Sequence, residues 1–209
     1  MLGNKNMVSN NKYNQPLILF GLLWACLITV LRALRWPNDW TEAHWLISYE
    51  FGFIKRALPG TLISPFVDFE SAELVIKIVS AIFLVLFILL LVWICYRVFA
   101  KQFNSVLVAL LFLTSPYIVM SGHLNGYYDN IVMIISILAC QLVMREKIWS
   151  ASILLAIGMF VHETILLVGL PSVVFIAFIK HVKNGKATSF RRLFEGFIFR
   201  YKMLLAIPL

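Results

Sequence analysis

The sequence predicts an all-α protein, a polytopic bundle of transmembrane helices, and three observations lead to that prediction. Of its 209 residues, 61% are hydrophobic and 13% are charged, with a mean hydropathy of +0.89, which does not suit a water-soluble surface. Several apolar runs approach the roughly 20 residues that a helix needs to cross a bilayer. The three cysteines all lie within apolar runs, which argues against a disulfide framework or a thiolate metal site.

We expect about six spans, taken in order along the chain. The apolar runs at residues 16–34, 74–100, 103–120 and 131–144 each predict one span. The first run remains as an anchor, because no small-residue cleavage site of a signal peptide follows it. The run at residues 149–179 is too long for one ordinary span. We expect two short helices that turn at His162, Glu163 and Thr164, and one tilted, kinked helix is the alternative.

The formal charge of +8 is explained by membrane topology. A cytoplasmic N-terminus places most Lys and Arg inside and most acids outside, and no soluble basic domain is present to hold nucleic acid. Residues 36–72 then form a partly helical outer loop, in which Asn38 caps a short helix.

The C-terminal part of the chain is basic and apolar in alternation. Residues 181–202 form a basic cytoplasmic segment, and residues 190–209 predict an interfacial helix that leads into a further apolar run. We therefore expect a single transmembrane domain over residues 1–209 that belongs to a longer protein.

Three polar clusters fall on the outer face in this topology. Desolvation at the edge of a span costs free energy unless a charged group has a partner, which favours a function for Asp39, Asp129 and the His162–Glu163 pair. Lys55 and Arg56 suit an anionic lipid headgroup or a pyrophosphate. The alternative is that these loop groups only solubilise and anchor the interface. The candidate site residues are Asp39, Glu42, Glu50, Lys55, Arg56, His123, Tyr128, Asp129, His162 and Glu163.

Several standard motifs are excluded. The stretch from His162 to Leu166 lacks the second histidine of a zinc-protease helix, and no P-loop, G-x-G-x-x-G or G-x-S-x-G motif is present.

The residues do resemble a family. Four segments carry the resemblance: the acid after the first span (Asp39), the run from Tyr49 to Gly60 that contains Lys55-Arg56, the stretch Gly126-Tyr127-Tyr128-Asp129, and the pair His162-Glu163. In these segments the chain resembles polytopic bacterial membrane proteins of surface-polysaccharide synthesis, the GT-C glycosyltransferases. The resemblance extends over residues 17–179. The family's usual close pair of acids is replaced here by Asp39-x-x-Glu42.

The resemblance implies an enzyme of the bacterial inner membrane that moves a sugar from a polyprenyl-phosphate donor to an acceptor on the extracytoplasmic face. Asp39, with Glu42 nearby, takes the place of the catalytic base, and Lys55 and Arg56 stabilise the departing lipid phosphate. The remaining candidate residues orient the sugar or bind a divalent cation.

Two other classes of protein stay open. The first is a transporter or flippase for a lipid-linked or anionic substrate, although the internal repeats typical of transporters are not visible. The second is a non-catalytic membrane assembly subunit, whose outer acids would be scattered.

Overall fold

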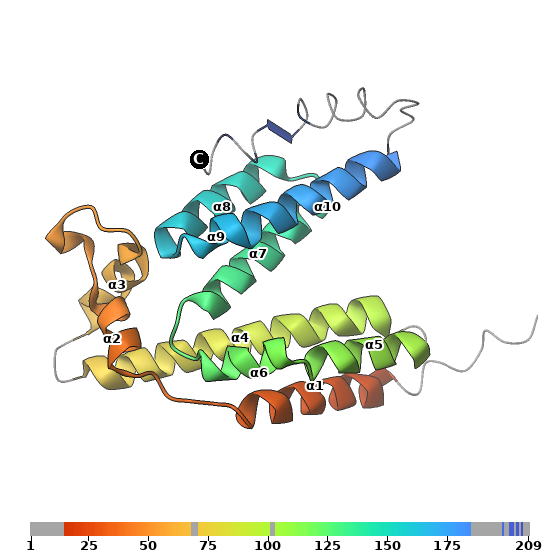
Figure 1. Ribbon diagram of the computed structural model, residues 1–209, viewed down its shortest axis with the longest axis horizontal. Helices are drawn as coiled ribbons and strands as arrows, with labels where there is room; N and C mark the ends of the chain where they lie inside the picture. The colour runs from red at the N-terminus through yellow and green to blue at the C-terminus, as the bar shows by residue number, and fades with distance from the viewer. Residues whose placement is uncertain are drawn as a thin grey trace, which may run out of the picture. The chain divides into compact units, whose positions relative to one another are not determined.

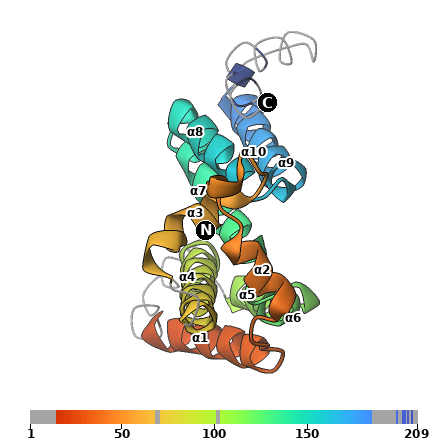
Figure 2. The same cartoon turned by 90° about the vertical axis from the view of Figure 1, so that its left-hand side faces the viewer.

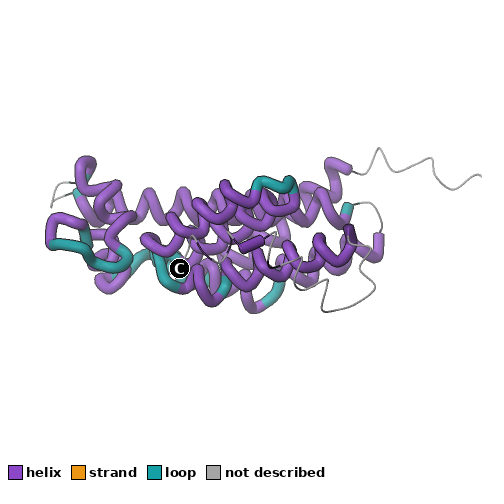
Figure 3. The backbone as a smooth tube through the Cα atoms, turned by 90° about the horizontal axis from the view of Figure 1, so that it is seen from above, coloured by secondary structure: helices purple, strands orange, loops and turns teal. Residues whose placement is uncertain are grey.

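The computed structural model describes residues 15–67, 71–100 and 103–184, together with positions 198, 201, 202, 204 and 206. Within these residues every regular element is a helix (Figure 3), which confirms the all-α prediction. The chain divides into two compact units. Unit 1 comprises Met1–Trp36 and Ser80–Asn125, and unit 2 comprises Pro37–Val79 and Gly126–Leu209.

Three described helical stretches are long and apolar enough to cross a membrane: Ala72–Phe99, Asn104–His123 and Thr164–Lys183. Three further helices are apolar but shorter: Gln15–Leu31, Asp129–Met144 and Ile148–Val161.

In unit 1, α1 (Gln15–Leu31) packs against α5 (Phe103–Leu113) and α6 (Pro116–His123). The run expected at residues 103–120 is therefore broken, because Pro116 cannot continue the hydrogen bonding of a preceding helix and instead begins a new one. A Cβ at Gly122 would lie 2.6 Å from the carbonyl oxygen of Val30, so α1 and α6 approach closely there. The long helix α4 (Ala72–Phe99) begins in unit 2 and continues in unit 1.

In unit 2, α7 (Asp129–Met144) is the central helix, and both α8 (Ile148–Val161) and α10 (Gly169–Asn184) lie along it (Figures 1 and 2). The chain leaves α8 at His162, passes through the single turn α9 (Thr164–Leu167) and returns as α10. The expected turn at residues 162–164 is confirmed, and the single kinked helix is excluded.

The loop between α1 and α4 is partly helical, as expected. It contains α2 (Asp39–Leu46), α3 (Ala57–Ile63) and two 3₁₀ turns, Tyr49–Phe51 (η1) and Ser64–Phe66 (η2). Asn38 caps α2, because its Oδ1 accepts the backbone N–H of Thr41 at 3.0 Å. A Cβ at Gly60 would lie 2.0 Å from the carbonyl oxygen of Ile47, so glycine lets α3 approach the end of α2.

The basic segment at residues 181–202 is described only in part. Its first residues, 181–184, are the end of α10. The interfacial helix expected at residues 190–209 lies outside the described residues, apart from isolated positions.

Candidate functional site

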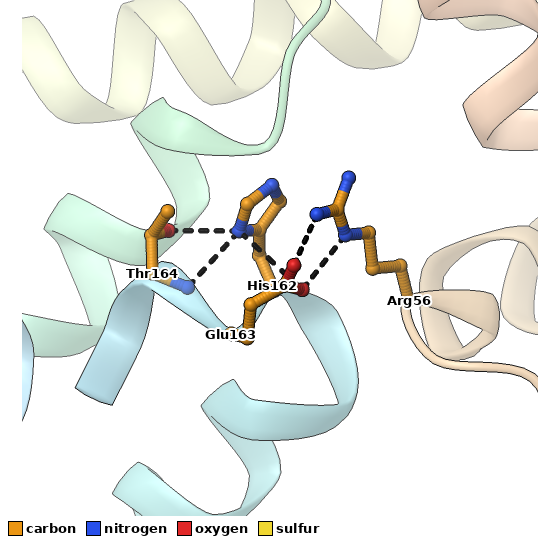
Figure 4. Close-up of polar contacts among 4 residues, drawn as sticks. All are labelled: Arg56, His162, Glu163 and Thr164. Carbon is orange, nitrogen blue, oxygen red and sulfur yellow. Dashed lines mark hydrogen bonds and ion pairs between the residues drawn. The ribbon is translucent and has the colours of Figure 1, made fainter. Parts of the chain in front are cut away.

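Arg56 and Glu163, 107 residues apart in the sequence, form an ion pair within unit 2. Nε of Arg56 donates to Oε2 of Glu163 at 2.7 Å, and Nη2 donates to Oε1, so the guanidinium holds the carboxylate through two parallel hydrogen bonds (Figure 4). The two side chains are 32% and 46% exposed, which keeps the pair accessible from solvent. The hydrogen bonds from Arg56 lower the pKa of Glu163 to about 2.

The backbone of Arg56 is itself unusual. Its φ of 68° and ψ of 8° place it in the left-handed region immediately before α3. A residue with a Cβ adopts this conformation at a cost of roughly 1–2 kcal/mol. The ion pair with Glu163 offsets part of that cost, and this backbone conformation directs the guanidinium toward the turn between α8 and α9.

His162 lies at that turn, as the residue that ends α8. Its Nδ1 accepts the backbone N–H of Thr164 at 3.1 Å and lies 2.9 Å from the Thr164 hydroxyl oxygen. An accepting Nδ1 assigns the ring proton to Nε2 in the neutral imidazole. Burial, together with the charge of Arg56, lowers the pKa of His162, so the ring is neutral at pH 7.

Arg56 and His162 each have one ring or guanidinium nitrogen outside the hydrogen bonds described above, and these two nitrogens point toward the same side. The ion pair uses Nε and Nη2 of Arg56, and Nη1 makes no hydrogen bond with the described residues. In Figure 4 this Nη1 and Nε2 of His162 point away from Glu163 and Thr164, toward the same side. The cluster thus offers N–H donors to an incoming group, and such donors suit anionic oxygens.

A buried aromatic pair, Tyr128 and Trp45, packs beside the cluster. Tyr128 is 2% exposed, and its ring meets that of His162 edge to face at 6.3 Å. Its hydroxyl donates to the carbonyl oxygen of His44 at 2.7 Å, and Trp45 donates from Nε1 to the carbonyl oxygen of Gly126 at 2.7 Å. These two hydrogen bonds fix α2 to the loop before α7, and the edge-to-face contact of Tyr128 with Trp45 at 5.0 Å joins them.

Asp129 completes the cluster as the first residue of α7, the end of a helix where a negative charge is favourable. Its charge raises the pKa of Arg56, after the larger effect of Glu163, and it opposes the lowering of the His162 pKa. Lys55 is exposed beside Arg56 in the sequence. The sequence-predicted residues that unit 2 brings together are therefore Arg56, Tyr128, Asp129, His162 and Glu163.

The other predicted residues lie elsewhere. Asp39 is exposed in the first turn of α2, and its side chain makes no hydrogen bond or ion pair with the described residues. Glu42, in the same turn, acts electrostatically on Lys77 of α4. Glu50 is exposed in the 3₁₀ turn η1, and His123 ends α6 in unit 1.

Metal binding has little support from the clustered side chains. Within residues 15–67, 71–100 and 103–184, no three His, Cys, Asp or Glu side chains are grouped closely enough to hold an ion. The carboxylate of Glu163 is already engaged by Arg56.

Three contributors to this cluster were not predicted from the sequence. The carbonyl of His44, the indole of Trp45 and the amide of Thr164 fix Tyr128, Gly126 and His162 respectively. The Thr164 hydroxyl, 2.9 Å from Nδ1 of His162, was a readable signal, because Ser and Thr side chains favour short-range hydrogen bonds at helix ends. The contacts of α2 with residues 126–128 are long-range and leave no local pattern.

Over the residues that the structure describes, the chain is helical, with three helical stretches long and apolar enough to cross a membrane and an arginine-centred group of ionisable residues at helix ends. Comparisons with family models, curated proteins and solved structures found no match.

Proposed function

We propose that the protein is a membrane glycosyltransferase that moves a sugar from a polyprenyl-phosphate donor to an extracytoplasmic acceptor. The observation that carries the proposal is the pairing of Arg56 with Glu163, which presents the free Nη1 of Arg56 on the same side as Nε2 of His162. A lipid phosphate with two anionic oxygens matches these donors. The resemblance of the outer-loop residues to the GT-C enzymes supplies the reaction.

The proposal includes a topology of six spans with the N-terminus in the cytoplasm. The spans are α1, α4, α5 with α6, α7, α8, and α9 with α10. At a rise of about 1.5 Å per residue, α8 is about 21 Å long, less than the roughly 30 Å of hydrocarbon. His162 and Glu163 then lie in the headgroup region, which water reaches, and pairing with Arg56 offsets the partial desolvation of the carboxylate there.

The chemical step is a substitution at the anomeric carbon. The acceptor hydroxyl oxygen forms a bond to that carbon, its proton passes to a carboxylate, and the bond from carbon to the phosphate oxygen breaks. Arg56 and His162 stabilise the charge on the departing polyprenyl phosphate. The carboxylate is Asp39 by the GT-C resemblance, and Asp129 is the acid that lies with the donors.

The proposal is tested by measuring sugar transfer in membranes. Membranes containing the protein are given a panel of radiolabelled polyprenyl-phosphate sugars, and release of polyprenyl phosphate is measured. We expect Arg56→Gly, which relieves the backbone strain, to fold but to lose about a hundredfold in transfer. Asp39→Asn and Asp129→Asn separate the two candidate bases, because the true base should cost about 100-fold or more.

The matched control is Arg145→Gln, which removes an exposed positive charge at the opposite end of α7 from Asp129 and should leave transfer unchanged. Transfer that is unchanged in Arg56→Gly would remove Arg56 from the mechanism, and a wild type that releases no polyprenyl phosphate from any donor of the panel would exclude the enzyme proposal.

Helix-end positions favour a transferase over a transporter. Asp129 begins α7 and Glu163 lies between α8 and α9, whereas a carrier needs its polar groups near the bilayer centre. In sealed vesicles, lipid movement across the bilayer without sugar release would support the flippase instead.

A further inference from the structure

A second candidate site lies at the other end of α7, far from Arg56. A pocket of about 380 Å³ is lined by Met144, Ile176, Ile179, Lys180 and Lys183. This volume lies within the roughly 300–1,000 Å³ of small-molecule sites. Since α7 has 16 residues, its two ends are separated by about 24 Å, so this pocket and the Arg56 cluster are separate features of unit 2.

The two lysines of the pocket have different roles. Lys180 donates from Nζ to the carbonyl oxygens of Met144 at 2.7 Å and Val143 at 3.3 Å, and it lies 3.3 Å from Oε1 of Glu146. It thereby adds a donor to the carbonyl groups at the end of α7, where the Val143 carbonyl also accepts from the backbone N–H of Glu146 at 3.0 Å. Lys183 is exposed and makes no hydrogen bond or ion pair with the described residues. Lys183 is the cation available to a ligand.

The remaining walls are aliphatic. Ile176 and Ile179 come from α10 and Met144 from α7, so the pocket is lined by three apolar side chains and the two lysines. The surroundings add Arg145 and Lys147, both exposed, and the acid Glu146, whose charge Lys180 balances. A ligand that fits must be apolar along most of its length and anionic at one end.

We propose that this pocket binds one anionic phospholipid, with part of an acyl chain against Ile176 and Ile179 and the headgroup phosphate beside Lys183. Basic pockets between membrane helices are a recurrent way of holding such headgroups. With the apolar stretch Thr164–Lys183 crossing a membrane, Lys183 is the last residue of that span and lies at the level of the headgroups. The proposal does not depend on the glycosyltransferase assignment.

The test measures lipid binding to the full chain in a neutral detergent by native mass spectrometry. The probes are dioctanoyl phosphatidylglycerol, which is anionic, and dioctanoyl phosphatidylcholine, which has the same chains and no net charge. We expect the anionic lipid to bind in a one-to-one complex more tightly than the zwitterionic lipid. Lys183→Gln should weaken this complex about fivefold, the contribution expected of one lysine at a charged membrane surface.

Two further variants test the pocket itself. Ile176→Phe fills it without changing charge and should also weaken the complex, whereas Lys147→Gln removes a cation from the same end of α7 outside the pocket and should not. Circular dichroism and monodispersity confirm that each variant folds. Equal binding of both lipids, unchanged binding in Lys183→Gln and Ile176→Phe, or displacement by inorganic phosphate alone would each overturn the proposal.

Discussion

Arg56 aligns with Glu163 through two parallel hydrogen bonds, although its own backbone is held in the left-handed region to do so. The ion pair joins the loop that contains α3 to the turn between α8 and α9. Strain of this kind persists where surrounding contacts over-determine the conformation, and it is concentrated at functional positions. The pair therefore contributes modestly to stability and is the centre of the proposed activity.

The first prediction concerns the stability of the protein at low pH. Arg56 holds the pKa of Glu163 at about 2, whereas the unfolded chain binds this proton at about pH 4.3. The ion pair therefore contributes stability above about pH 4.3, and this contribution is lost as the pH falls through about 2. Because the pair is partly exposed, we expect less than about 1 kcal/mol. Thermal unfolding in detergent between pH 5.5 and 2.5 should show this decline in the wild type, and a parallel curve for Glu163→Gln would contradict it.

The second prediction concerns a milder pH range. Burial lowers the pKa of His162 below its ordinary value near 6.5, so between these two values the unfolded chain binds a proton that the native state does not. Stability is complete above about pH 6.5 and decreases as the pH falls through the folded value. His162→Gln can still accept the Thr164 N–H but cannot titrate, so its unfolding temperature should change less between pH 7.5 and 5.5. Other histidines are unchanged in this pair and cancel in the comparison.

The third prediction concerns Gly126. Its φ of 99° is unfavourable for a residue with a side chain, and a Cβ would lie 2.9 Å from Cγ of Pro37. Gly126→Ala should lower the free energy of unfolding by about 2 kcal/mol. The matched control is Gly21→Ala in α1, where a Cβ meets nothing within 4 Å and helix propensity favours alanine by up to about 1 kcal/mol. Equal losses in the two variants would show that the turn at residue 126 is not constrained.

The fourth prediction is a double-mutant cycle on the aromatic pair. Trp45→Phe leaves the buried carbonyl of Gly126 without its donor, and Tyr128→Phe does the same to His44. We expect losses of about 2 and about 1 kcal/mol. Both bonds fix α2 to one loop, so the double variant should lose less than the sum by at least about 0.5 kcal/mol. The losses are measured by chemical unfolding. Strictly additive losses would show that the two hydrogen bonds act independently and would contradict this prediction.

The local features of the fold were readable from the sequence. The cap at Asn38 and the turn at His162 follow from a side-chain acceptor before a helix and from a polar triplet within an apolar run. The break at Ser115 was also readable, since Pro116 disfavours helical backbone in the preceding residue. It was missed because the apolar composition continues across it.

The candidate site was only partly accessible to such reasoning. The edge of a span identified Glu163 as a candidate, since desolvation there requires a partner, and the basic pair Lys55-Arg56 identified Arg56 as a phosphate ligand. Their pairing across 107 residues depends on how α3 lies against α8, a long-range contact with no sequence period. The role of Asp39 stays a prediction, because it comes from placement after the first span and α2 leaves its side chain exposed.

The glycine at position 60 has a use beyond stability. No other amino acid fits there without moving the backbone of Ile47, and the left-handed Arg56 stands only four residues earlier. Any chain that keeps this backbone must satisfy both of these stereochemical constraints at the same spacing. Distant relatives can therefore be sought by a pattern of three features: an arginine, a glycine four residues later, and a histidine followed by an acidic residue about a hundred positions downstream.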